Sequence, residues 1–211
     1  MEKPNLTGIS AIVVSAIILS LTILYKQQID FATEFPIALL SFLIIIAGSI
    51  GVKKLVAYHY EADISTKFWE FYQFGFRKGK HLKKSLPMIW FPIVLDLFSQ
   101  GHIWWMGILQ FDIKAKPERV SKRHGLYRFS EMTEWHIAVI SAWGVVACLV
   151  FSVVGYLLGL DQFTKLAVFY ATWSIVPFSN LDGSKIFFGN RALWATIAII
   201  TGFFLSVVLM I

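Results

Sequence analysis

Long apolar stretches are the feature that most restricts how this chain can fold. They cover residues 8–25, 35–52, 136–160, 163–176 and 193–211, and four of them approach the roughly 20 residues that an α-helix needs to cross a bilayer. Only 15% of the residues are charged, against about 25% in soluble domains. The sequence therefore predicts an all-α, polytopic membrane protein, built as one integral membrane domain over residues 1–211.

A further apolar stretch, residues 86–111, is interrupted by polar and helix-breaking residues. It begins and ends among basic residues, so an even number of crossings, or none, is expected. Pro92 and Gly101 interrupt it, and such backbone is tolerated at membrane depth only where protein or a wet cavity surrounds it. We expect a broken or re-entrant hairpin, which brings the total to about five to six membrane segments. Asp96 and His102 lie inside it and are candidates to line a cavity, because ionisable residues at membrane depth are costly.

The basic residues are distributed very unevenly between the loops. Most of them lie in residues 53–85 and 112–135, and only Lys26 and Lys165 of the nineteen Lys and Arg residues fall on the opposite side. Cytoplasmic loops carry the excess of positive charge in membrane proteins. We therefore predict a multi-pass protein of the cell membrane with a cytoplasmic amino terminus and two basic cytoplasmic segments. The net charge of +6 follows from this pattern, and no nucleic-acid partner is expected.

One short motif lies between the last two apolar stretches. It reads Ser174-Ile-Val-Pro177-Phe-Ser-Asn-Leu181-Asp182-Gly183. It resembles the N-x-x-P-x-x-x-L-D-G element of site-2 proteases, the intramembrane zinc metalloproteases, with Ser174 in the place of Asn. In that family the Asp is the third zinc ligand, so the resemblance assigns this position to Asp182.

Two further stretches resemble the same family in its archaeal-type members, although the motif that binds zinc differs. Residues 54–69 resemble the segment that follows the family's H-E-x-x-H helix, and residues 140–147 stand where it has a small-residue helix. In H-E-x-x-H two histidines one helical turn apart bind zinc and the Glu is the general base. Aligned on residues 54–57, the five motif positions become Ser49, Ile50, Gly51, Val52 and Lys53. The resemblance then implies a site-2-protease-like core in a pseudoprotease, with a vestigial site at Ser49, Lys53 and Asp182.

This alignment leads to a geometric prediction. Ser49 and Lys53 share one helix face because they are four residues apart, and in the family's fold that face looks at Asp182. We predict a Lys53–Asp182 ion pair with its charged atoms within about 4 Å, and no cofactor. The function implied is non-catalytic: the protein binds or regulates a membrane protein partner, or a substrate helix, within the lipid bilayer.

Two other functions remain open on the sequence alone. His59 and Asp63 are also four residues apart, so with Asp182 they could hold zinc and leave one position for water. That arrangement would make the protein an active intramembrane zinc metalloprotease. A small transporter or membrane assembly factor, with Asp96 and His102 in a cavity, is the third possibility.

Overall fold

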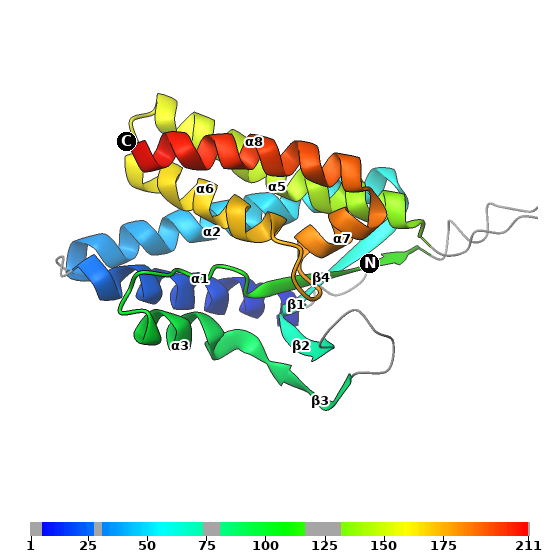
Figure 1. Ribbon diagram of the computed structural model, residues 1–211, viewed down its shortest axis with the longest axis horizontal. Coiled ribbons are helices and arrows are strands. Elements are labelled where there is room, and N and C mark those ends of the chain that lie inside the picture. The colour runs from blue at the N-terminus through cyan, green and yellow to red at the C-terminus, as the bar shows by residue number, and fades with distance from the viewer. Residues whose placement is uncertain (1–5, 28–30, 74–80, 117–131, 211) are drawn as a thin grey trace, which may run out of the picture.

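The computed structural model describes residues 6–27, 31–73, 81–116 and 132–210. Its long helices run side by side along one axis, and its strands gather toward the end of this bundle opposite the C-terminus (Figure 1). The helices are α1 (Leu6–Gln27), α2 (Phe31–His59), α3 (Phe91–Phe98), α5 (Glu134–Leu157), α6 (Asp161–Ile175), α7 (Asp182–Gly189) and α8 (Arg191–Met210). Helix α5 contacts α2, α6, α7 and α8 and therefore lies at the centre of the bundle.

Three helices of the described chain are long and apolar enough to cross a membrane. They are Ala32–His59 in α2, Glu134–Leu157 in α5 and Arg191–Met210 in α8. The number is smaller than the predicted five to six segments. The described apolar part of α1, Gly8–Leu24, is shorter, and α6 has only 15 residues. The three apolar helices are compatible with a membrane protein, and each of the five predicted apolar spans does coincide with a helix.

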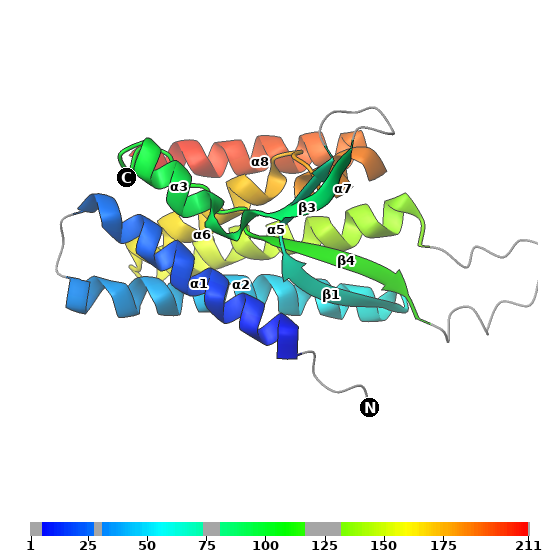
Figure 2. The same ribbon diagram turned by 90° about the horizontal axis from the view of Figure 1, so that it is seen from below.

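The chain is mostly helical, as predicted, but four strands interrupt the helices, so the all-α prediction is confirmed only in part. Strand β1 (Ala62–Phe68) pairs antiparallel with β4 (Leu109–Ala115), and β2 (Glu70–Gln73) pairs antiparallel with β3 (His81–Pro87). Figure 2 shows β1 and β4 side by side next to α2. Glu61 lies two residues after the end of α2 and has a φ of 51°, a conformation in which a helix cannot continue. The first predicted basic cytoplasmic segment, residues 53–85, thus contains the end of α2, strands β1 and β2, and most of β3. Most of the second predicted basic segment, residues 112–135, lies outside the described residues.

The segment predicted as a broken hairpin is neither a straight helix nor a pair of helices. It comprises the end of β3, a 3-10 turn (Met88–Trp90), α3, and then extended chain that leads into β4. Pro92 lies in the first turn of α3, where its missing N–H costs no hydrogen bond. At the other end, Gln100 and Gly101 turn the chain back with positive φ angles of 52° and 76°. The prediction of broken backbone therefore agrees with the structure, whereas the return half is extended.

Candidate functional site

Lys53 and Asp182 meet in the interior of the bundle. Lys53 lies on α2 and Asp182 is the first residue of α7, and their side chains form a salt bridge between Nζ and Oδ2. Lys53 is 2% exposed and Asp182 is 6% exposed. The predicted Lys53–Asp182 contact is confirmed, although the two residues are 129 positions apart in the chain.

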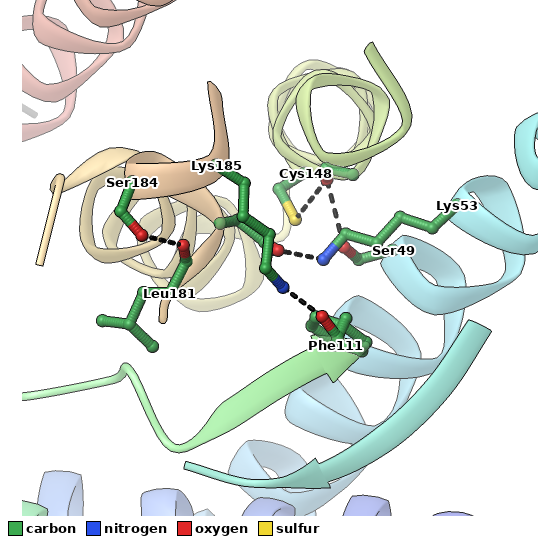
Figure 3. A network of polar contacts seen from close by, with 9 residues as sticks. Ser49, Lys53, Phe111, Cys148, Leu181, Ser184 and Lys185 are labelled. Atoms are coloured by element: carbon green, nitrogen blue, oxygen red, sulfur yellow. Dashed lines mark hydrogen bonds and ion pairs between the residues drawn. The ribbon is translucent and has the colours of Figure 1, made fainter. Parts of the chain in front are cut away.

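Ser49 lies one helical turn before Lys53 and faces the same side of α2. Its hydroxyl donates a hydrogen bond to the backbone carbonyl of Gly144 on α5, at 3.1 Å. Cys148 donates to the same carbonyl at 3.3 Å. Figure 3 shows these side chains gathered between α2, α5 and α7. The face of α2 that the alignment assigned to the vestigial site is therefore the face that meets Asp182.

The loop after α6 places Asp182 in this position. Helix α6 ends at Ile175, and the Ile175 carbonyl accepts a hydrogen bond from Trp194 Nε1 at 2.9 Å. Val176 caps the helix, and Pro177 comes next. The chain then turns at Ser179, whose φ is 48°, and α7 begins at Asp182. A carboxylate in the first turn of a helix is favoured by the partial positive charge of the N-terminal N–H groups. The Ser184 hydroxyl fixes this turn through a hydrogen bond to Leu181 O at 2.7 Å.

Gly144 makes room for the aliphatic part of Lys53. A Cβ atom at position 144 would come within 1.9 Å of Lys53 Cε, so any larger residue would displace the lysine. On its other side the Lys53 ammonium lies 3.6 Å from the centroid of the Phe111 ring, and such cation–π contacts are strongest where water is excluded. Three elements distant in sequence therefore enclose one ammonium group.

A second lysine approaches the same place from α7. Lys185 Nζ donates a hydrogen bond to the backbone carbonyl of Phe111 on β4 (Figure 3). Burial lowers the pKa of Lys185 below its usual value, and the negative charge of Asp182 opposes this effect in part. Its partner is a neutral carbonyl, whereas Asp182 is already paired with Lys53.

The Phe111 carbonyl belongs to the edge of β4 that faces away from β1, which we call the free edge because no other described strand pairs with it. Lys116 N donates to Glu61 O, and Trp69 N donates to Ile108 O. The backbone N–H and C=O groups of every second residue of β4 therefore bond to β1, and those of the residues between them point away from β1. The residues whose backbone groups point away are Leu109, Phe111 and Ile113. Within the described ranges no other strand pairs with β4. Its outer edge therefore carries backbone N–H and C=O groups that no described strand uses, although the Phe111 carbonyl already accepts a hydrogen bond from Lys185 Nζ.

A small cavity lies between this edge and the ion pair. It is lined by Met106, Gly107, Ile108, Leu109, Phe111, Tyr170, Ser174, Leu181 and Asp182, and it has room for about one water molecule. The second carboxylate oxygen of Asp182, Oδ1, is buried and has no hydrogen-bond partner in the described part of the chain. An uncompensated acceptor of this kind is costly, so the cavity suits a hydrogen-bond donor.

His59 and Asp63, the alternative metal ligands, do not share a helix face. Helix α2 ends at His59 and Asp63 already belongs to β1, because the left-handed backbone at Glu61 separates the two elements. Asp63 is exposed and lies 3.5 Å from Lys116 Nζ, while Asp182 is buried beside Lys53. Over the described ranges no three His, Cys, Asp or Glu side chains lie close enough together to hold a metal ion.

Asp96 and His102 lie on opposite sides of a tight turn at the end of α3. Asp96 is 3% exposed, whereas His102 is exposed and its Nδ1 lies 2.8 Å from Ser99 O. Neither residue lines the cavity beside Asp182.

Three residues of the site were missed by sequence reasoning: Phe111, Gly144 and Lys185. Lys185 follows Asp182 by three residues, which places both on one face of a short helix, so this signal was present in the sequence. Gly144 was visible only as a small residue in an apolar helix. Phe111 comes from a strand that the sequence analysis did not predict.

The residues around Asp182 do not fit a zinc ion. A protonated amine has no lone pair to donate, and a serine hydroxyl is not among the ligands that zinc sites use. Asp182 and the nearby Cys148 thiol would then be the only ordinary zinc ligands of the described site, and zinc sites use at least three. Comparisons with protein-family models, with curated proteins and with solved structures found no match for this chain.

Proposed function

We propose that this protein is a non-catalytic relative of site-2 proteases that binds or regulates a membrane protein partner. The observation that carries the proposal is the salt bridge of Lys53 with Asp182. The resemblance places a zinc ion between these two positions, and here a side-chain cation neutralises the carboxylate. Charges inside membrane proteins are usually paired in this way.

The binding place that we propose is the free edge of β4. An extended segment of the partner would pair with the outward N–H and C=O groups of this strand, a common mode of peptide recognition. The cavity beside Asp182 lies along the same edge and offers an acceptor to the partner. Partner recognition through this edge requires no metal and no catalytic base.

Metal analysis of the purified protein tests the non-catalytic part of the proposal. We expect no stoichiometric zinc in the wild-type protein, and about one zinc in the variant Ser49→His/Ile50→Glu/Lys53→His, because this variant restores two histidines one turn apart opposite Asp182. The matched control is the same triple variant with Asp182→Ala, which should lose the metal.

Two results would contradict this part. Stoichiometric zinc in the wild-type protein that disappears in Asp182→Ala would favour the active metalloprotease. A folded triple variant that binds no zinc would remove the support that the resemblance to site-2 proteases gives.

A substitution in the outer edge of β4 tests the binding part. A partner is first isolated by cross-linking in native membranes, and its affinity is then measured for Ile113→Pro and for Ile113→Ala. Proline removes the outward N–H of residue 113, whereas alanine keeps it and removes the same side chain. A hydrogen bond contributes about 1 kcal/mol, so proline should weaken binding by about fivefold relative to alanine. Equal affinities of two folded variants would exclude this edge as the binding place.

A further inference from the structure

The segment from Met88 to Ile108 lies along the bundle rather than beyond its end. Figures 1 and 2 both show α3 beside α1 and pointing toward the end of the bundle where α8 ends, and α3 contacts α1. After α3 the chain turns and runs back to β4. The segment is therefore a hairpin at the same level as the helices that are long enough to cross a membrane.

One face of this hairpin consists of large apolar side chains that nothing in the described structure covers. Trp90, Val94, Leu97 and Phe98 are 65%, 44%, 52% and 88% exposed. Their spacing of three and four residues places them on one side of the helix. Burying each such side chain contributes about 1.5–3 kcal/mol in water, so leaving all four exposed to water would be costly.

The opposite face of α3 carries Asp96, the only Asp, Glu, Lys or Arg residue between Leu86 and Phe111. Asp96 is 3% exposed, and Pro92 on the same face is also buried. In a helix on a water-soluble protein the polar face points outward and the apolar face points inward. Helix α3 has the reverse arrangement, and this is the arrangement expected of a helix surrounded by hydrocarbon.

We propose that the outer face of α3 contacts the acyl chains of the lipid bilayer, so that residues 88–108 form a membrane-embedded re-entrant hairpin. The neighbouring helix supports this choice of partner. On α1, Ile9, Val13, Ile17 and Leu21 are also exposed, and they too recur every four residues. Helix α1, which α3 contacts, thus carries an exposed apolar stripe of its own. This inference does not depend on the proposed function.

The backbone of the hairpin meets the requirements of a lipid environment. Non-helical chain survives at membrane depth only where protein covers its polar groups. At the turn, Gly101 N donates to Asp96 O at 2.9 Å and Ile103 N donates to the Ser99 hydroxyl at 3.1 Å. On the return path Met106 and Ile108 are each 1% exposed, so this extended chain lies against the protein core. Apart from the buried Asp96, the polar residues of the hairpin, Ser99, Gln100 and His102, lie in the turn.

Site-directed spin labelling of the purified full-length protein in phospholipid bilayers tests this proposal. A nitroxide is attached to Phe98→Cys and, in a second variant, to Val94→Cys. The native Cys148 is fully buried, so the unlabelled parent protein measures any background. The control positions are Ile199, which is 74% exposed on α8, and Lys67, whose side chain is 56% exposed on β1.

The readout is the collision rate of each label with oxygen, which concentrates in hydrocarbon, and with a water-soluble nickel chelate. We expect the ratio of the oxygen collision rate to the nickel collision rate at positions 94 and 98 to match the ratio at Ile199. It should exceed the ratio at Lys67 severalfold. A ratio like that at Lys67 would place α3 in water and overturn the proposal. Low collision rates with both reagents would also overturn it, because a protein surface, such as a second copy of the chain, would then cover this face.

Discussion

Replacing Lys53 with methionine is expected to lower the free energy of unfolding by about 3–5 kcal/mol, because it leaves a buried carboxylate without its counter-charge. Lys53 and Asp182 are 2% and 6% exposed, so water cannot replace the lost partner. Methionine keeps the unbranched lysine side chain beside Gly144 as far as the ε position, so the main change is the loss of the ammonium group. Denaturant unfolding in detergent micelles measures the difference.

Two controls separate the charge from other effects of the substitution. Lys54→Met changes the neighbouring lysine, which is exposed on the same helix, and should shift stability by no more than about 0.5 kcal/mol. The double variant Lys53→Met/Asp182→Leu removes both charges and should recover most of the loss, because a buried ion pair can be exchanged for apolar residues at little cost. If Lys53→Met alone is as stable as the wild-type protein, the ion pair does not hold α2 and α7 together.

Gly183→Ala is expected to destabilise the protein by about 3 kcal/mol, at the upper end of the usual range for overpacking. A Cβ atom at position 183 would lie 2.2 Å from Ile175 O and 2.4 Å from Val176 O. Both atoms belong to the backbone, so no side-chain rotation relieves the contact. Helix α7 would have to move away from the end of α6, and Asp182 would move with it. A melting-temperature measurement in micelles, combined with denaturant unfolding, determines the loss.

The matched control is Gly202→Ala on α8, where nothing lies within 4 Å of the added carbon. Alanine is about 1 kcal/mol better than glycine inside a helix, so this variant should be as stable as the wild-type protein or slightly more so. Equal stability of the Gly183→Ala and Gly202→Ala variants would show that α6 and α7 do not pack as closely as the structure indicates.

The sequence predicted the helices well because their signal is local. A run of apolar residues of nearly the right length specifies a helix in a membrane protein, since the backbone must satisfy its own hydrogen bonds there. The ion pair could also be predicted, because the Asp182 motif and the spacing of Ser49 and Lys53 fit one arrangement of the site-2 protease family. The role of these residues as a vestigial site remains a proposal.

The strands were missed for an identifiable reason. In the sequence, residues 62–68 (ADISTKF) and 109–115 (LQFDIKA) largely alternate between apolar and polar side chains, which is the period of a half-buried strand. Their lysines and aspartates were instead interpreted as a charged cytoplasmic segment. The same error produced the pairing of His59 with Asp63, since the distance between i and i+4 positions is short only while the helix continues.

By itself the sequence determined where the apolar helices lie, that the segment after Leu86 is broken, and that Asp182 needs a cation near it. Each conclusion follows from the cost of placing polar groups in an apolar environment, and this cost depends on residues close together in the chain. Only the tertiary structure decided what surrounds the pair: the Phe111 ring, the space left by Gly144, the second lysine and the free edge of β4. These contacts join α2, β4, α5 and α7, and they form only when the chain is packed, because no local pattern encodes a distance between segments so far apart.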